Sequence, residues 1–413
     1  MTALRWWFRA INKILGVRVD SERSNGFESS LESGRVRAPL ALIARWLDQG
    51  DVYTAKAALE EVLEWEPGHL GAHEALVQVH LRAGDPASAH MEQTRRALFL
   101  AGISGPRADC VWAHATLLYG EMPRGWDLYE ARLLAPGLTM PERHFTHPRW
   151  NGEPFPGRTL LLHYEQGLGD TLMFVRYAAR VKGLGGRVVL TAQRPLADLV
   201  ATCPGVDEVI PKGAPVPPFD IHFPLPSLPW LFRTELGSIP ADIPYLRVPP
   251  QVPHRQELTE QLALGDGRLR VGLAWKGSSD HPRDAARSIS PATLAPLAAL
   301  PGVAWYSFQK EENLVAPFTE LLPLGRLLSS FSDTAFALSA MDLLITVDTA
   351  VAHLAGALGI PVLLLVTNIP DWRWLMDRDD SPWYPTVRLY RQPMPGDWDS
   401  VVQRVLADLM SPG

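Results

Sequence analysis

The segment Asp348-Thr349-Ala350-Val351-Ala352-His353 follows an apolar run predicted to be a strand and opens a predicted helix. Asp348 or Thr349 can cap this helix, whose first backbone N–H groups are free to bind an anion. The helix dipole favours a diphosphate at that position. His353 lies one turn after Thr349, on the same helix face, and can donate to phosphate or ribose oxygens. The alternative interpretation is a plain helix cap beside a half-buried histidine.

A second group, Trp275-Lys276-Gly277-Ser278, directly follows the predicted strand 269–275. A lysine at the carboxyl end of a strand, beside a flexible glycine, can reach a leaving phosphate as a point charge. The alternative is a solvated loop lysine, which is the commoner case in proteins.

A third group is Gln166-Gly167-Leu168-Gly169-Asp170, between the predicted strand 158–163 and the predicted helix 171–182. Its glycines allow a tight turn and close approach of another backbone. Asp170 lies at the helix N-terminus, where a carboxylate is stabilised and could accept the proton of an attacking hydroxyl. The alternative is a helix cap. The third glycine of a dinucleotide fingerprint is missing, which argues against a role in NAD binding.

An aromatic group, Asp371-Trp372-Arg373-Trp374 with Ser381-Pro382-Trp383-Tyr384, completes the candidates. Trp372 and Trp374 could stack on a base or a sugar. An ordered, tryptophan-rich loop buried at a domain interface is an equally good interpretation.

No metal site is predicted. No carboxylate or cysteine partner is evident for His69 and His73, which lie four residues apart. We therefore expect neither a metal nor another cofactor. Lys276, His353 and the helix N-terminus would then have to stabilise a leaving group.

Two kinds of element must position these residues. From 38 to 135 the pattern predicts helical hairpins. Gly50-Asp51 is repeated as Gly84-Asp85, and Ala55 as Ala89, both at an offset of 34 residues. This is the tetratricopeptide period, and a third unit spans 112–134. We expect two or three degenerate repeats. Residues 136–157 are predicted to be a linker.

From residue 158 onward, apolar strand-like runs alternate with helical ones, which predicts parallel sheets covered on both faces. A Pro-rich stretch, 211–253, separates two such series. We expect one Rossmann-like domain at 158–255 and a second at 268–413. Ligands in such sheets bind at the carboxyl ends of the strands, so the cleft between the two domains is the expected site.

Composition sets broad limits. Hydrophobic residues make up 46% and charged residues 20% of the 413 residues, which is typical of a globular chain. The net charge of −6 argues against nucleic acid as a partner. Two distant cysteines, Cys110 and Cys203, indicate no disulfide framework, and a reducing cytosol fits best.

Residues 1–37 are predicted to be an amphipathic and linker segment. Within 1–19, tryptophan, phenylalanine and isoleucine alternate with arginine and lysine. The apolar run is too broken for a signal peptide. The pattern suits a basic helix resting on a membrane surface, so a cytoplasmic protein with peripheral contact to the inner membrane is one hypothesis. A terminal helix packed on its own protein, or a frayed end, is the alternative.

From about Gly120 to the C-terminus the chain resembles bacterial tetratricopeptide-repeat glycosyltransferases of the GT-B fold, related to the lipopolysaccharide heptosyltransferases and distantly to the O-GlcNAc transferases. The matching phrases are Gly125-Trp126 with Tyr129-Glu130 and Arg132, Trp150-Asn151-Gly152, 163–170, 272–276, Asp348-Thr349 with His353 through 359–361, and 371–374 through 381–384. The resemblance departs at Ala350, where heptosyltransferases usually have glycine, and at 366–368, where they usually have Gly-Pro-Thr. This weighs against ADP-heptose as the donor.

The resemblance implies a GT-B enzyme preceded by helical repeats, transferring a sugar from a nucleotide-sugar donor to a hydroxyl with inversion. It implies Asp170 as general base and Lys276 with 348–353 as donor contacts. We also place Gly169, Trp275 and Ser278 in the donor site. The repeats suggest a protein acceptor, such as a surface or flagellar subunit. A heptosyltransferase-like enzyme of glycan synthesis and an inactive repeat scaffold are the alternatives.

Overall fold

The computed structural model describes residues 43, 46, 51–100, 102–135, 145–165, 167–279, 284–310 and 320–410. The predicted N-terminal segment 1–37, including the proposed membrane-contacting residues 1–19, lies outside the described residues, as does Gln166. The chain forms two compact units, Met1–Thr139 and Met140–Gly413, called here the helical unit and the α/β unit.

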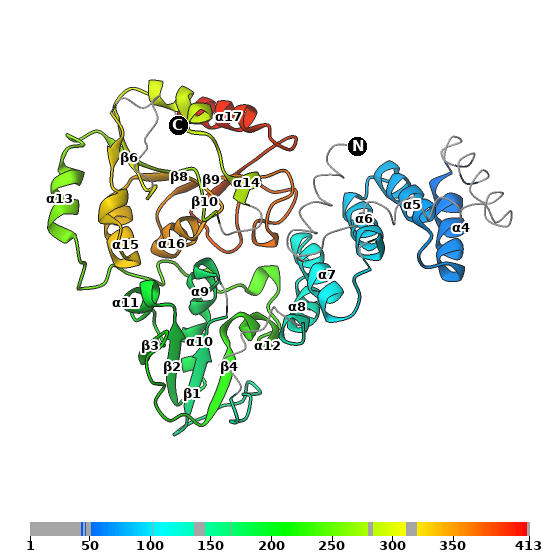
Figure 1. Ribbon diagram of the computed structural model, residues 1–413, viewed down its shortest axis with the longest axis horizontal. Coiled ribbons are helices and arrows are strands. Elements are labelled where there is room, and N and C mark those ends of the chain that lie inside the picture. Colours follow the sequence, from blue (N-terminus) through cyan, green and yellow to red (C-terminus); the bar gives the residue numbers. More distant parts are fainter. Residues whose placement is uncertain are drawn as a thin grey trace. The chain divides into compact units, whose positions relative to one another are not determined.

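The helical unit consists of consecutive helices, each packed on the next (Figure 1). Their bounds are α4 Val52–Trp65, α5 Leu70–Arg82, α6 Pro86–Leu100, α7 Pro106–Leu118, α8 Met122–Tyr129 and the 3-10 helix η2 Glu130–Leu133. Asp51 caps α4 by accepting a hydrogen bond from the Thr54 N–H at 3.1 Å. Helices are therefore present where the sequence predicts them. Their assignment to the tetratricopeptide family stays a prediction.

His69 and His73 have structural roles in this unit. His69 Nδ1 accepts from the Ala72 N–H at 3.0 Å and so caps α5. The two ring nitrogens of buried His73 lie 2.9 Å from Glu92 Oε2 and 2.8 Å from the Pro67 carbonyl oxygen. Glu92 is the carboxylate partner that the sequence did not reveal, because it comes from the next helix.

The α/β unit contains two parallel sheets. The first sheet has the order β3-β2-β1-β4 and the second the order β10-β9-β8-β5-β6-β7. The strands of the first are β1 Thr159–His163, β2 Arg187–Ala192, β3 Glu208–Pro211 and β4 Ile221–Pro224; those of the second are β5 Leu269–Ala274, β6 Val303–Ser307, β7 Leu322–Pro323, β8 Leu343–Val347, β9 Val362–Val366 and β10 Val387–Arg391. Every pairing between these strands is parallel, as predicted for the two α/β series.

The α/β unit has two halves, one built on each sheet. Helices of the first half, which contains the first sheet, are α9 Leu168–Phe174, η3 Val175–Tyr177, α10 Ala178–Lys182, η4 Arg194–Leu196, α11 Ala197–Val200, η5 Leu225–Ser227, α12 Leu228–Leu231 and η6 Leu236–Ser238. Those of the second half are α13 Arg255–Ala263, α14 Asp284–Arg287, η7 Pro291–Ala299, η8 Gly325–Leu327, α15 Phe331–Ser339, α16 Ala350–Leu358, η9 Trp372–Trp374 and α17 Trp398–Met410. Helix α13 falls between the two predicted domains. Helix α16 ends at Leu358 and is followed by Gly359, whose φ of +76° is the left-handed conformation that glycine adopts at little cost.

Two segments depart from the sequence prediction. Strand β4 lies inside the Pro-rich stretch 211–253 and pairs with β1. Residues 145–157, predicted to be linker, pack onto the first sheet: Arg149 bridges to His222, and Trp150 and Phe155 are buried. Buried apolar side chains therefore outweigh the turn-forming composition of these segments.

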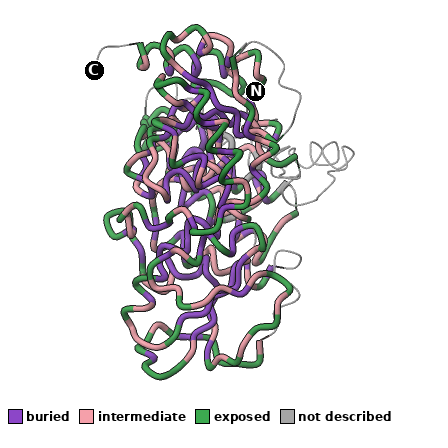
Figure 2. The backbone as a smooth tube through the Cα atoms, turned by 90° about the vertical axis from the view of Figure 1, so that its left-hand side faces the viewer, coloured by how far each residue is buried: buried purple, intermediate pink, exposed green. Residues whose placement is uncertain are grey.

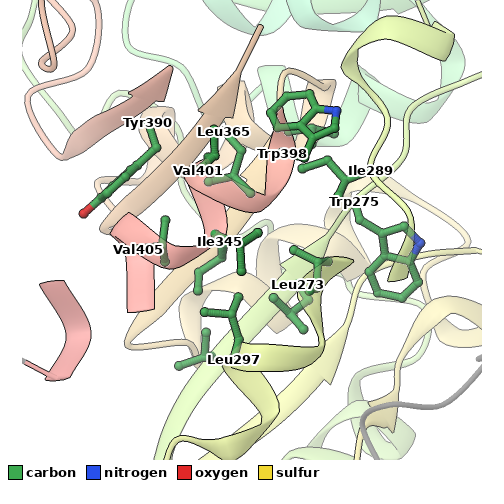
Figure 3. Close-up of a cluster of buried hydrophobic side chains, with 14 of the residues drawn as sticks. Leu273, Trp275, Ile289, Leu297, Ile345, Leu365, Tyr390, Trp398, Val401 and Val405 are labelled. Atoms are coloured by element: carbon green, nitrogen blue, oxygen red, sulfur yellow. The ribbon is translucent and has the colours of Figure 1, made fainter. Parts of the chain in front are cut away.

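The second sheet is covered on one face by α17 and η7, where a hydrophobic cluster joins strands and helices (Figure 3). Trp275, Ile289, Trp398 and Val401 all belong to this cluster. In Figure 2, stretches of buried residues lie toward the inside of the tube and stretches of exposed residues lie along its outer edges. The cores on both sheets hold the strand ends in place, and the site is built at those ends.

Candidate functional site

The N-terminus of α16 carries the first predicted group. Thr349 is the N-cap residue, with extended backbone angles of φ −142° and ψ 170°, but its side chain makes no capping hydrogen bond. Thr349 is 9% exposed, and its Oγ1 is buried without a hydrogen-bond partner among the described residues. A plain cap would satisfy this hydroxyl internally. The helix N-terminus therefore presents free backbone donors and one unsatisfied hydroxyl.

His353 lies buried one turn along α16, at 4% exposure. Its Nδ1 lies 2.9 Å from the Tyr384 hydroxyl, and its ring stacks on Trp374 with centroids 5.2 Å apart. Burial, followed by the charge of Arg373, lowers the pKa of His353 to about 3. The imidazole is thus neutral at pH 7 and can act as a hydrogen-bond donor or acceptor but not as a cation.

Gly169 brings the two halves of the α/β unit into contact at this point. A Cβ atom at Gly169 would lie 2.8 Å from His353 Cδ2, closer than real contacts allow. Helix α9 therefore approaches α16 so closely that only glycine fits. The predicted acceptor-side turn and the predicted donor-side helix meet here, across the two sheets.

Asp170 follows at the third position of α9. Its Oδ2 accepts from the Gly167 N–H at 3.3 Å, as a helix-capping carboxylate does. Its Oδ1 accepts a hydrogen bond from Arg373 Nη2. The side chain is 22% exposed. The candidate base is thus close to α16 and also ion-paired with a residue of the other half.

Asp348 precedes the helix and does not cap it. Its backbone carbonyl accepts from Arg287 Nη1 at 2.7 Å, and its Oδ1 lies 4.0 Å from His353 Nε2. Burial, and next the charge of Asp371, raises the pKa of this carboxyl, while the charges of Arg287 and Arg373 lower it. Ala350 is the first residue of α16 and is half-buried.

Lys276 and Ser278 lie in the loop after β5. The Gln309 side-chain carbonyl accepts from both the Trp275 N–H and the Lys276 N–H, each at 3.0 Å. Lys276 is half-buried and Ser278 is exposed. A single glutamine after β6 thus fixes the backbone of the loop that carries Lys276.

The rings of three predicted site residues, Trp275, Trp372 and Trp374, are buried and do not form an exposed binding surface. Trp275 is 9% exposed and packs in the hydrophobic cluster of Figure 3, away from any ligand-facing role for its ring. Trp372 and Trp374 are 2% and 0% exposed, and Trp372 stacks on Phe174 of α9. The burial of both rings favours the buried-interface interpretation of this loop, and their stacking on a base or a sugar stays an untested prediction.

Three residues near the site were not identified from the sequence as charge carriers or supports. Arg287 reaches the α16 N-terminus from α14, Arg373 joins Asp170 to Asp371, and Arg176 joins the two halves. The buried Arg176 guanidinium donates to the Trp383 carbonyl at 2.6 Å and to the Tyr245 hydroxyl at 2.9 Å. Only the spacing of Asp371 and Arg373 indicates an ion pair in the sequence, and both residues alternate there with tryptophans.

The polar side chains elsewhere in the described part of the chain do not gather into a metal centre. Among the residues that the structure describes, no group of three or more His, Cys, Asp or Glu side chains is arranged to hold a metal ion. None of the described helices is both long and apolar enough to span a bilayer.

No family model matches the chain. Protein FlbA of Caulobacter vibrioides is 30% identical over 396 residues, covering 87% of this chain and 64% of that protein. The chain thus spans slightly less than two-thirds of the length of this curated relative.

Solved structures with similarity to the chain include a glycosyl transferase of family 9 from Veillonella parvula, with 13% identity and a TM-score of 0.43, covering 62% of this chain and 97% of that one. Another is the E. coli ADP-heptose lipopolysaccharide heptosyltransferase II, with 14% identity and a TM-score of 0.43, covering 61% and 97%. An O-GlcNAc transferase mutant from Thermobaculum terrenum is 15% identical with a TM-score of 0.27, covering 91% of both chains. All three TM-scores lie below 0.5, so these similarities carry no argument about function.

Proposed function

We propose that the chain is a glycosyltransferase that moves a sugar from a nucleotide-sugar donor to a hydroxyl acceptor. The observation that carries the proposal is the close approach of Gly169 to His353. It brings a carboxylate on α9 next to the open N-terminus of α16. One side of the site can then hold an anionic leaving group while the other accepts a proton.

The donor diphosphate would bind the free N–H groups of α16 and the Thr349 hydroxyl, which has no partner among the described residues. Lys276, on a loop held by Gln309, would contribute a positive charge to the leaving group. Neutral His353 could donate a hydrogen bond without adding charge. No metal is required in this scheme, because helix N–H groups and cations stabilise the developing phosphate charge.

Asp170 would act as general base. It would take the proton of the acceptor hydroxyl as that oxygen attacks the anomeric carbon, and the bond to the diphosphate would break from the opposite face. This direct displacement inverts the anomeric configuration. We further propose a protein acceptor presented by the helical unit, a cytoplasmic location and, through residues 1–19, peripheral membrane contact.

A transfer assay tests the proposal. Purified protein is incubated with UDP, GDP, ADP and CMP sugars, and nucleotide release is measured for the wild type, Asp170→Asn and Lys276→Ala. We expect turnover in the wild type and a loss of at least roughly 100-fold in Asp170→Asn, as for removal of a general base. Near-normal turnover in both folded variants would remove these residues from the site.

The ion pair between Arg373 and Asp170 favours a second candidate, a binding scaffold without catalysis, because it occupies the carboxylate oxygen that a base needs. A scaffold would show no nucleotide release with any donor. A heptosyltransferase-like enzyme of glycan synthesis would instead release nucleotide faster when a glycan acceptor is added to this assay.

A further inference from the structure

Arg373 is shared between carboxylates of the two halves. Its Nη1 donates to Asp371 Oδ1 at 2.7 Å, and its Nη2 donates to Asp170 Oδ1. The guanidinium lies 4.4 Å over the Trp372 ring, and the side chain is 11% exposed. Packing thus holds one cation between the candidate base and the loop of the second half.

Arg373 lies close to the N-terminus of α16. The next residue, Trp374, stacks on the ring of His353 with centroids 5.2 Å apart, and Asp170, which pairs with Arg373, follows the glycine that approaches His353. The charge of Arg373 lowers the pKa of His353, after burial, and it is among the charges that lower the pKa of Asp348. Both residues flank the Thr349 hydroxyl that lacks a partner among the described residues. Arg373 therefore lies near the anion site, although the hydrogen bonds described above join it to carboxylates.

A guanidinium suits both kinds of partner. Its donors match carboxylate and phosphate oxygens in the same fork geometry, and hydrogen bonds between charged groups are the strongest in this class. A diphosphate at the start of α16 would compete with Asp170 for Arg373. The competition links the two events, so that binding of the phosphate and release of the carboxylate favour each other.

We propose that Arg373 is a donor-controlled switch, which holds Asp170 in the free protein and moves to the donor diphosphate when the nucleotide sugar binds. Asp170 Oδ1 then becomes available to the acceptor hydroxyl. This inference rests on the proposed function. It makes donor binding the step that readies the base, so the donor must bind before the acceptor can react.

Calorimetric titration with UDP, GDP, ADP and CDP tests the switch. The nucleotide that binds the wild type is then titrated into Asp170→Asn, Arg373→Gln and the double variant. We expect roughly tenfold weaker binding in Arg373→Gln, from loss of a charged hydrogen bond. We expect tighter binding, by about threefold or more, in Asp170→Asn, because its neutral amide competes less for Arg373.

The double variant separates the switch from simple repulsion between Asp170 and the phosphates. The switch predicts that the gain from Asp170→Asn disappears when Arg373 is glutamine. Arg378→Gln is the matched control, since Arg378 lies in the same loop and pairs with the exposed Asp380. It should bind like the wild type.

Three results would overturn the switch while leaving the proposed function intact: unchanged binding in Arg373→Gln, unchanged or weaker binding in Asp170→Asn, or a gain that persists in the double variant. Binding of none of the four nucleotides would instead remove the proposed function, and the switch with it. Thermal unfolding without nucleotide identifies a misfolded variant. If Arg373→Gln is misfolded, Arg373→Lys replaces it. This variant should bind the nucleotide more weakly than the wild type, and Asp170→Asn should increase its affinity by a smaller factor.

Discussion

Acid should destabilise the α/β unit through His353. This side chain is 4% exposed, and its pKa falls from 6.5 to about 3 on folding. Because the folded pKa lies below the unfolded value, the stabilisation is fully present above pH 6.5 and is lost as the pH falls toward 3. Each unit of pH within this window costs about 1.36 kcal/mol, so moving from about pH 7 to pH 5 should cost about 2 kcal/mol.

Urea unfolding followed by tryptophan fluorescence measures this cost. The wild type and His353→Gln are compared at about pH 7 and pH 5. Glutamine does not titrate, so the wild type should lose about 2 kcal/mol more than the variant over this range. The difference at the higher pH gives the packing cost of the substitution itself. Equal losses in the two proteins would show that His353 is not held neutral by its surroundings, and would refute the electrostatic picture of the site.

Two further substitutions test how the site is assembled. In thermal unfolding, Gly169→Ala should destabilise the protein by about 1–3 kcal/mol, since its Cβ would lie 2.8 Å from His353, and it should also abolish nucleotide binding. Gly237→Ala is the control: its Cβ would meet nothing within 4 Å, so its stability should equal that of the wild type. Gln309→Leu should weaken nucleotide binding about tenfold while leaving the pH dependence of turnover unchanged, because it frees the backbone that carries Lys276; unchanged affinity in titration calorimetry would remove this positioning role.

The elements of the α/β unit could be predicted because their signals are local. The continuous apolar run at β8 and the helical pattern of α16 each require burial on a known side, and the turn between them follows. Strand β4 could not be predicted in the same way. It has four residues inside a proline-rich stretch, and its pairing with β1 spans about sixty residues of sequence.

The site could be predicted only as separate groups. Asp170 and the start of α16 can be predicted from their positions at helix N-termini, which the sequence reveals. Their meeting depends on Gly169, whose small size matters only because α16 folds against it. The pairing of Arg373 with Asp170 joins residues 203 positions apart, and no local pattern encodes such a contact.

For the tryptophans, the position in the sequence is misleading about the role of the side chain. Trp275 and Trp374 lie beside residues of the site in sequence, yet both rings are buried. Burial of a large aromatic side chain is strongly favourable, so tryptophans usually pack in a core. Adjacency to a motif therefore does not distinguish a ligand-facing ring from a core ring. Only the packing around each ring decides this.

The central claim, that the N-terminus of α16 binds the diphosphate of a nucleotide sugar, is tested most directly by thermal unfolding of the wild type and Thr349→Val with UDP, GDP and ADP sugars. Without ligand the two should be equally stable, or valine slightly more so, because the hydroxyl has no partner among the described residues. At about 100 times its dissociation constant, a bound donor should stabilise the wild type by about 2.7 kcal/mol and the variant by clearly less. No stabilisation of the wild type by any donor, or equal stabilisation of both proteins, would contradict the account.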